Sequence, residues 1–248
     1  MNLRSYIGCF LLVVLVGSRI SIAQDVSESP PSSEKAADEG WVTLFEEDGV
    51  PKGWRVTEWS DVSKEVTGHD WEVSQGTLRS GDKRGTWLIS EAKYDNFELQ
   101  FEIKLTERGN SGVALRTPPQ GDPAFDGLEF QVADFRYNTQ ATPAELTGGL
   151  YRAVAPLQQL YQPTEWNRVS LKLDGQKFVA SLHGQVIQNI DLQEFDQPVL
   201  RHDGTKASSL KDRPRAGSIG FQHLSREGRV EIRGARLRPI LTQSANPK

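Results

Sequence analysis

The chain has 248 residues, a formal net charge of −4 and 37% hydrophobic residues, which is enough for one principal globular core. Its mild acidity, with no stripe of Lys or Arg at helical or strand spacing, argues against nucleic acid as a partner. The 22 glycines and 13 prolines interrupt short alternating segments, a pattern typical of an all-β protein.

The first 23 residues predict a secretory signal peptide. Arg4 precedes an apolar run from Tyr6 to Val16, and the small residues Ser21 and Ala23 precede the expected cleavage site. The apolar run is short for a membrane span, so a membrane is expected as a partner only if the signal remains uncleaved. We therefore expect an exported protein, periplasmic or secreted.

The segment after the signal predicts a disordered linker over residues 24–39, because it is rich in Ser, Pro, Glu and Asp and has no aromatic residue. One domain is expected over residues 40–241, followed by a short tail over 242–248. The single cysteine, Cys9, falls within the signal, so the exported domain must fold without disulfides.

Alternation of apolar and polar residues predicts several strands in the first half of the domain. Short strands are expected at 41–45 and 87–89, and a hairpin is expected to join 71–73 to 77–79 across Ser-Gln-Gly. Residues 96–105 alternate most clearly, with Phe97, Leu99, Phe101, Ile103 and Leu105 on one face. The next strand, 110–116, contains Gly112, which leaves room for the close approach of another group.

The second half of the domain continues the pattern with predicted strands at 128–132, 147–154, 166–173, 178–182, 186–190, 218–222 and 230–237. Asp174-Gly175 is a strong hairpin turn between two of these strands. The irregular passage 191–215 is longer than structural connections usually are, and such loops are commonly functional or mobile. About a dozen short strands without a repeat predict a two-sheet antiparallel sandwich.

The stretch FDGLEFQVAD, residues 125–134, is the strongest candidate for a functional strand. Its apolar residues alternate with Glu129 and Gln131, so these two polar side chains project together onto the open face. Asp134 would join them only if a β-bulge near Val132 or Ala133 reset the alternation. The alternative is an ordinary solvated face of a sandwich strand.

Metal and cofactor sites have no support in the sequence. The four histidines form no i,i+4 pair, there is no nearby cysteine, and no glycine-rich phosphate loop or nucleophile elbow is present. His223 ends a late strand, where it is either a group that reaches a cleft or a structural histidine. No cofactor and no metal ligand are expected.

Several sequence blocks occur in the order typical of one family. They are Trp41-Val-Thr-Leu-Phe, Gly53-Trp54, Trp71-Glu-Val, Gly76-Thr-Leu, Asn96-Phe-Glu-Leu, Asn110-Ser-Gly-Val-Ala-Leu-Arg116, Gly127-Leu-Glu-Phe-Gln-Val-Ala-Asp134, Gly149-Leu-Tyr151, Glu165-Trp-Asn167 and Gly217-Ser-Ile-Gly-Phe-Gln222. From Gly40 to Ile240 the chain thus resembles the 3-keto-disaccharide hydrolase family. The resemblance implies a jelly-roll sandwich of the concanavalin A-like lectin/glucanase type, export, and cleavage of glycosides oxidised to a ketone at carbon 3.

The same resemblance implies a set of site residues on the concave face. Its blocks indicate Asn110, Arg116, Glu129, Gln131 and Tyr151. The last block departs from the family pattern, because Gln222-His223-Leu224-Ser225 stands where Gln-Asp/Asn-His-Gly is usual. We expect Asn110, Gln131 and Gln222 to bind the oxidised sugar.

The expected mechanism starts with removal of the carbon-2 proton, which the adjacent ketone makes acidic. Glu129 is the expected base, with Asp134 as the alternative, and Arg116 is expected to stabilise the developing enolate. Tyr151 or His223 would protonate the departing oxygen. The oligomeric state stays open.

Two other functions are conceivable for a chain with this pattern. A direct double-displacement glycosidase is not expected, because Glu129 and Asp134 would be separated by roughly 13 Å of strand, whereas that mechanism needs carboxyls about 5–5.5 Å apart. A non-catalytic carbohydrate-binding module on the same fold remains an alternative. Convergence of Glu129, Arg116 and Tyr151 in one pocket would favour the enzyme, and dispersed positions would favour the binding module.

Overall fold

The computed structural model describes residues 39–68 and 71–241. The predicted signal peptide, nearly all of the predicted linker and the C-terminal tail lie outside these residues. Within the described ranges, no helix is long and apolar enough to cross a membrane.

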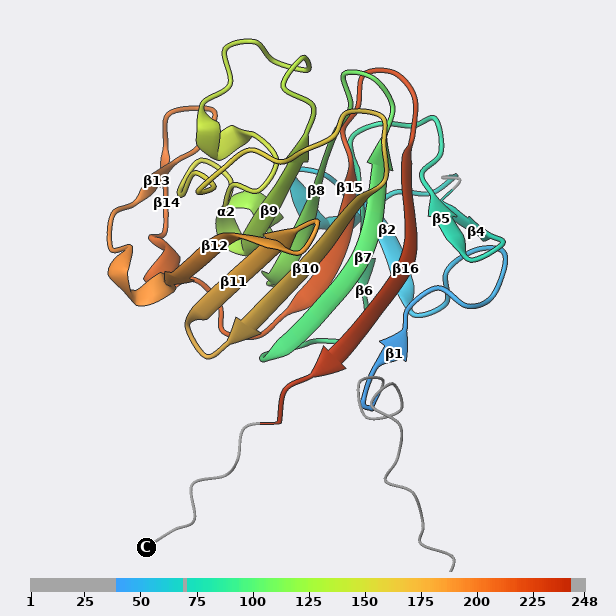
Figure 1. Ribbon diagram of the computed structural model, residues 1–248, viewed down its shortest axis with the longest axis horizontal. Helices are drawn as coiled ribbons and strands as arrows, with labels where there is room; N and C mark the ends of the chain where they lie inside the picture. The colour runs from blue at the N-terminus through green and yellow to red at the C-terminus, as the bar shows by residue number, and fades with distance from the viewer. Residues whose placement is uncertain (1–38, 69–70, 242–248) are drawn as a thin grey trace, which may run out of the picture. The chain divides into compact units, whose positions relative to one another are not determined.

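The domain is built from two stacked antiparallel sheets (Figure 1). The larger sheet has the order β12 (Gln185–Asp191), β11 (Lys177–Leu182), β10 (Asn167–Asp174), β7 (Phe97–Leu105), β16 (Val230–Pro239), β5 (Thr77–Arg79) and β4 (Glu72–Ser74), with β1 (Val42–Thr43) also paired to β16. The smaller sheet has the order β3 (Asp61–Glu65), β2 (Trp54–Glu58), β6 (Thr86–Ser90), β15 (Ser218–His223), β8 (Asn110–Thr117) and β9 (Leu128–Ala133).

Short elements occupy the loops of the described chain. They are α2 (Pro123–Asp126), the 3-10 helices η1 (Pro143–Glu145), η2 (Leu192–Glu194) and η3 (Leu210–Asp212), and a hairpin of β13 (Val199–Leu200) and β14 (Lys206–Ala207). The prediction of an all-β, two-sheet jelly-roll sandwich is confirmed.

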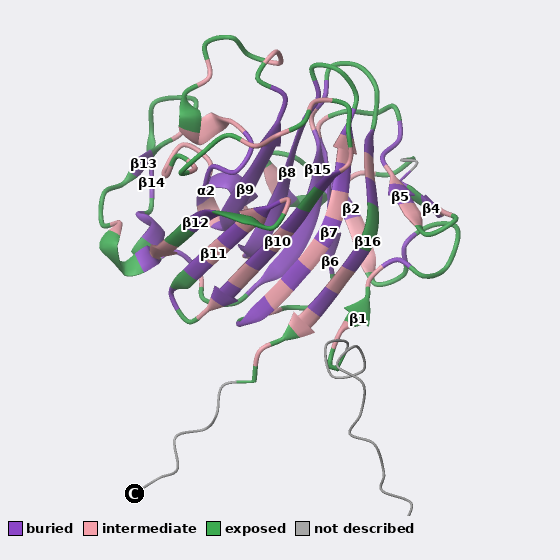
Figure 2. Ribbon diagram, in the orientation of Figure 1, coloured by how far each residue is buried: buried purple, intermediate pink, exposed green. Residues whose placement is uncertain are grey.

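The main core lies between the two sheets and follows from the alternation in the sequence. Strand β7 alternates buried and half-buried residues along its whole length (Figure 2). Its buried side chains, such as Phe101, meet those of the smaller sheet; the Phe101 and Phe221 rings pack edge to face with centroids 5.5 Å apart. Burial of such aromatic pairs is a large part of what stabilises a sandwich without disulfides.

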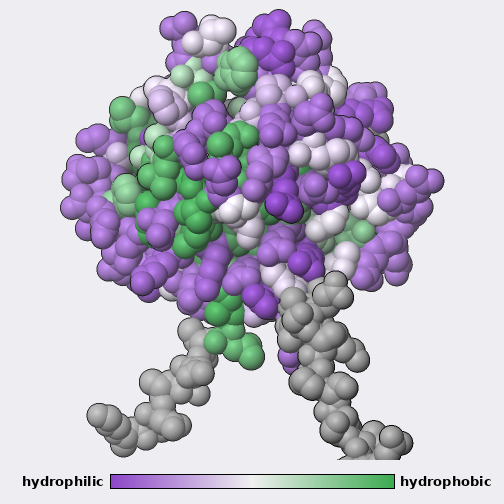
Figure 3. Space-filling view, in the orientation of Figure 1, coloured by the Kyte–Doolittle hydropathy of each residue, from purple (hydrophilic) through white to green (hydrophobic). Residues whose placement is uncertain are grey.

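The outer face of the larger sheet is polar, as its alternation predicts. Arg233 lies directly opposite Glu102, and their side chains are 2.7 Å apart. The same geometry recurs four residues further along β7, at Arg238 and Glu98. Figure 3 shows hydrophilic side chains over most of the face seen in Figure 1, with hydrophobic ones gathered on its left side.

Most predicted strands and both predicted hairpins are confirmed, but one predicted strand is wrong. Residues 147–154 form isolated bridges at Leu150 instead of a strand. Gly148 has a φ of +95°, and a Cβ on Gly149 would come within 2.5 Å of the Ala144 carbonyl oxygen, so the chain bends tightly here. Strands β2 and β3 were not predicted, because their mixed polarity hides the period.

The outer face of the smaller sheet is buried over part of its area. Val62, Trp87, Ile89 and Ala114 form a second apolar cluster there. The polar residues that alternate with the core residues of β8, β9 and β15 lie on this same face, and they form the floor of the site described next.

Candidate active site

Strand β9 places Glu129 and Gln131 on the outer face of the smaller sheet, as predicted. Leu128, Phe130 and Val132 point into the main core, and β8 pairs with β9 in one unbroken register. The Glu129 carboxylate lies against Gly112 on β8, where a Cβ would come within 2.8 Å of the Glu129 Cδ atom. The prediction that Gly112 leaves room for a close approach is confirmed.

A cleft of about 750 Å³, called the main cleft below, opens over this floor. A narrow recess beneath it contains Glu129 together with Asp122, Gln131 and Gln222. The main cleft and the recess share five lining residues, namely Trp59, Asn110, Tyr151, His202 and Leu224. Five of the predicted site residues therefore converge on one concave site: Asn110, Glu129, Gln131, Tyr151 and Gln222.

Two buried carboxyls lie at the bottom of the recess. Burial raises the pKa of Glu129 well above its ordinary value, and the nearby charge of Asp122 raises it further. Burial likewise raises the pKa of Asp122, to about 6, although its side chain caps α2 by accepting a hydrogen bond from the Ala124 N–H group. Groups with such pKa values suit proton transfer near neutral pH.

Tyr151 lies beside Glu129 on the segment that follows η1. Its backbone N–H donates to the Glu129 carbonyl oxygen at 3.0 Å, and its hydroxyl lies 3.4 Å from Nε2 of His202. Burial and the charge of Glu129 raise the pKa of the Tyr151 hydroxyl. The phenol therefore keeps its proton and can act as an acid.

His202 reaches the cleft from the connection between β13 and β14. Its ring packs edge-on against Phe125, with centroids 5.6 Å apart. Burial and the positive charge of Arg152 lower its pKa, so the imidazole is neutral at neutral pH. A functional role for the irregular passage 191–215 stays a prediction. His202 is the residue of that passage that lines both the main cleft and the recess.

Neutral polar groups complete the floor. The Asn110 Oδ1 atom is buried and has no hydrogen-bond partner among the described residues, so a ligand hydroxyl group could donate to it. Gln131 Oε1 accepts from the Val132 N–H group at 3.0 Å, which leaves its amide Nε2 as a donor. Trp59, 38% exposed, lines the wall.

The structure does not bring Arg116 together with Glu129. Its guanidinium is buried and donates to the carbonyl oxygens of Asp95 and Gly175 and to the Asn96 side chain. Arg116 has a φ of +50°, which rotates it out of the regular alternation of β8. The expected cation for the enolate is therefore a structural residue that joins loops outside the cleft.

Asp134 and His223 are also outside the recess that holds Glu129. No bulge interrupts β9, and the Asp134 carboxylate accepts hydrogen bonds from Arg136 and from the Arg108 backbone. It lines only a small adjacent recess of about 40 Å³. His223 follows Gln222 in the alternation and so faces the core between the sheets, where its ring lies edge-on to Trp71.

Sequence reasoning missed Asp122 and His202. The only signal for Asp122 was its position before Pro123, which is typical of a helix N-cap. His202 lies in a loop whose path the sequence does not reveal. Among residues 39–68 and 71–241, no three His, Cys, Asp or Glu side chains are grouped as metal ligands would be.

Comparisons with known proteins identify a family and a shared fold. Residues 40–238 match the family described as 3-keto-alpha-glucoside-1,2-lyase-like domain. A 3-keto-disaccharide hydrolase of Bacteroides thetaiotaomicron is 25% identical over 205 residues, and the match covers 68% of this chain and 67% of that protein. Crystal structures of two candidate glycosyl hydrolases of Parabacteroides distasonis share the fold. The first has a TM-score of 0.67 and 22% sequence identity, and the match covers 81% of this chain and 99% of that chain. The second has a TM-score of 0.61 and 19% sequence identity, and the match covers 84% of this chain and 97% of that chain.

Proposed function

The chain belongs to the 3-keto-alpha-glucoside-1,2-lyase-like family, and we propose that it is an exported enzyme that cleaves 3-keto-glycosides, including 3-keto-disaccharides. The observation that carries this proposal is the position of Glu129. Its buried carboxyl lies in the recess that adjoins the main cleft, beside a second carboxyl and a tyrosine that keeps its proton. That arrangement suits abstraction of an acidified C–H proton.

The first half of the reaction is an elimination. The Glu129 carboxylate takes the proton from carbon 2, and the electron pair of that bond forms an enolate whose charge rests on the carbon-3 oxygen. The bond between carbon 1 and the glycosidic oxygen then breaks, and the Tyr151 hydroxyl gives its proton to the departing oxygen. The products are an enone and the free aglycone.

The second half adds water across the enone. Water attacks carbon 1 and gives a proton to the Tyr151 phenolate, while Glu129 returns its proton to carbon 2. Both residues are thereby restored, and the net reaction consumes one water. A carboxylate with a raised pKa is a stronger base than an ordinary one, which favours removal of the carbon-2 proton. It also holds that proton until the final step, in which the proton returns to carbon 2.

The groups that would stabilise the enolate differ from the sequence expectation. With Arg116 outside the cleft, the Gln131 amide is the oriented donor nearest Glu129 along the strand. His202 would support the developing Tyr151 phenolate by donating from Nε2, because the two atoms are already 3.4 Å apart. Asn110 Oδ1 would accept from a sugar hydroxyl.

Incubation of the purified domain with paired 3-keto and ordinary disaccharides tests this proposal. We expect release of the aglycone only from the oxidised sugars. Robust hydrolysis of an unoxidised β-glucan would contradict the elimination mechanism. Binding of both sugars without release would instead identify a carbohydrate-binding module, for which the exposed Trp59 ring is suited to stack on a sugar face.

Export is a separate part of the proposal and rests on the amino-terminal signal sequence. We expect the mature protein to begin at Gln24. Amino-terminal sequencing of the exported form checks this expectation. A form that still begins at Met1 would contradict cleavage and favour attachment to the membrane.

A further inference from the structure

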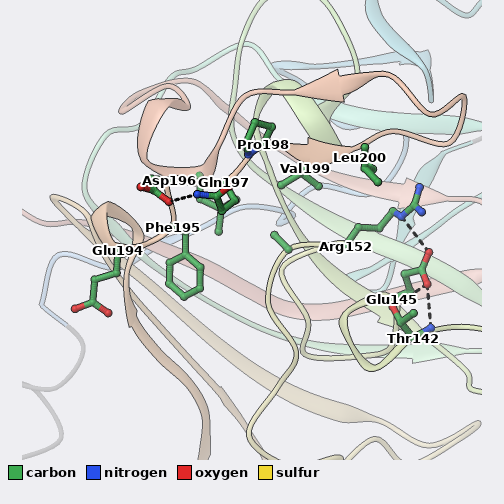
Figure 4. Close-up of a pocket in the computed structure, with 12 residues that line it drawn as sticks. Thr142, Glu145, Arg152, Glu194, Phe195, Asp196, Gln197, Pro198, Val199 and Leu200 are labelled. Carbon is green, nitrogen blue, oxygen red and sulfur yellow. Dashed lines mark hydrogen bonds and ion pairs between the residues drawn. The ribbon is translucent and has the colours of Figure 1, made fainter.

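A second cavity, called the side cavity below, lies next to the main cleft. Its volume is about 450 Å³. Figure 4 shows Thr142, Glu145 and Arg152 on one side of it and the residues from Glu194 to Gln197 on the other, with Pro198, Val199 and Leu200 along the top between them. None of the residues placed in the reaction above lines it, so the proposed chemistry leaves it without a role.

A wall that includes Glu145 and Arg152, called the partition below, separates the two cavities. Glu145 lines both of them, whereas Tyr151 lines the main cleft and the next residue, Arg152, lines the side cavity. On the β13–β14 hairpin, Leu200 lines the side cavity and His202 lines the main cleft. Arg152 directly follows Tyr151 in the chain and Leu200 lies two residues before His202, so the two cavities are adjacent.

Hydrogen bonds hold this partition in place without a ligand. Glu145 Oε2 accepts from the Thr142 N–H group at 2.9 Å and from its hydroxyl at 2.8 Å. The other carboxylate oxygen lies 3.3 Å from Nε of the Arg152 side chain. The backbone N–H group of Arg152 donates to the Ala144 carbonyl oxygen. A ligand would therefore enter a preformed site and would not have to order it.

The lining of the side cavity indicates the class of ligand. Phe195, Val199 and Leu200 give it apolar surface, and Gln197 adds a polar group at the rim. Three carboxylates, those of Glu145, Glu194 and Asp196, line the cavity with only one guanidinium, that of Arg152, so an anionic ligand is disfavoured. Apolar surface with hydrogen-bonding groups suits an uncharged sugar ring, which has one face of C–H groups and a rim of hydroxyls.

We propose that the side cavity is a further sugar subsite, which makes 3-keto-oligosaccharides of three or more units better substrates than 3-keto-disaccharides. This inference rests on the proposed function. The main cleft alone has the volume of a pocket for a drug-sized ligand, and a disaccharide fills such a pocket. The side cavity is the place where the next glycosyl unit fits, beyond the Glu145–Arg152 partition.

The test compares a 3-keto-disaccharide with a 3-keto-trisaccharide that has one more neutral sugar on the leaving-group side. We expect kcat/KM to be at least tenfold higher for the trisaccharide. Leu200→Trp, which fills the side cavity from its exposed edge, should remove that advantage and leave cleavage of the disaccharide within twofold. Leu157→Trp is the matched control, because Leu157 is an exposed leucine that lines neither cavity.

Equal kcat/KM values for the two substrates in the unmodified protein would overturn the inference, and so would an equal loss for both substrates in Leu200→Trp. Binding to Glu129→Gln, measured by calorimetry, separates this inference from the proposed function. Tighter binding of the trisaccharide without cleavage of either sugar by the unmodified protein would refute only the proposed chemistry. Cleavage of both sugars with equal binding would refute only the subsite.

Discussion

The Glu129 carboxylate occupies the space that any side chain at Gly112 would need. A Cβ at that position would come within 2.8 Å of the Glu129 Cδ atom and closer still to Oε1. The absence of a side chain on one strand thus sets the position of the proposed base on the next strand.

Gly112→Ala should displace the Glu129 carboxyl and lower kcat by about a hundredfold, because a shift of about 1 Å in a catalytic group has effects of that size. The fold should survive, since the group that must move is the end of a side chain. Gly109→Ala is the control: its Cβ would meet the Thr106 carbonyl oxygen and the Leu105 side chain. We expect it to lower Tm without lowering the activity of the folded protein, and the opposite pattern would contradict the assignment.

Glu129→Gln keeps the shape of the side chain and removes its basicity. Deuterium exchange at carbon 2 and release of the aglycone should fall together by roughly a hundredfold or more. Glu58→Gln, at an exposed glutamate on the rim of the main cleft, should change both rates little. If exchange persists in Glu129→Gln, Asp122 becomes the first candidate for the base.

Tyr151→Phe should separate the two steps that Glu129→Gln affects together. Without the phenolic proton, aglycone release should fall by roughly a hundredfold while carbon-2 exchange continues. The loss should be smallest for leaving groups of low pKa, which need no acid. Tyr94→Phe, at a half-buried tyrosine packed on Phe97, serves as the control. Equal losses of carbon-2 exchange and aglycone release would exclude Tyr151 as the general acid that protonates the leaving oxygen.

Asp122→Asn should stabilise the protein above pH 6 and much less near pH 4. Asp122 retains its proton in the folded state up to about pH 6, whereas the unfolded chain loses it near pH 4. Rising pH therefore lowers the free energy of unfolding across that window, by at most about 3 kcal/mol. Asn removes this dependence and can still accept from the Ala124 N–H group. Urea unfolding at pH 4, 6 and 8 measures the difference, and parallel curves for the two proteins would refute it.

Arg116→Gln should cost stability and not chemistry. It leaves the carbonyl oxygens of Asp95 and Gly175 without their buried donor, at a cost of about 2–4 kcal/mol. Denaturant unfolding measures this loss, and the rate per folded molecule, measured well below Tm, should stay close to that of the unmodified protein. A hundredfold lower rate at full folding would return Arg116 to the reaction.

The sequence predicts the parts of this fold in which one face of a strand is buried and the other is not. Strand β7 and the β10–β11 hairpin show that period directly, and Glu129 and Gln131 follow from the same rule. The rule fails at Arg116, because a left-handed φ rotates the side chain away from the face that the alternation along β8 predicts.

Asp122 and His202 escaped prediction for a different reason. Each lies next to a contact between segments that are distant in the sequence: Arg201 pairs with Asp126 of α2, and Arg213 donates to the Ala124 and Gly127 carbonyl oxygens. Only the folded chain brings α2 and the β13–β14 hairpin to the same side of Glu129. Local sequence patterns contain no record of such contacts.

The position of β16 has a consequence for how the chain acquires its structure. The last strand lies between β7 and β5, and it also pairs with β1 at the opposite end of the domain's sequence, with Val42 opposite Leu237. The larger sheet thus cannot be completed until nearly all of the chain is available. Strand pairings between such distant parts of the sequence make folding slow. A fragment that ends before Val230 would expose the edges of β7 and β5, and edges of that kind pair with other chains. C-terminal truncation should therefore give aggregates and not a smaller stable domain.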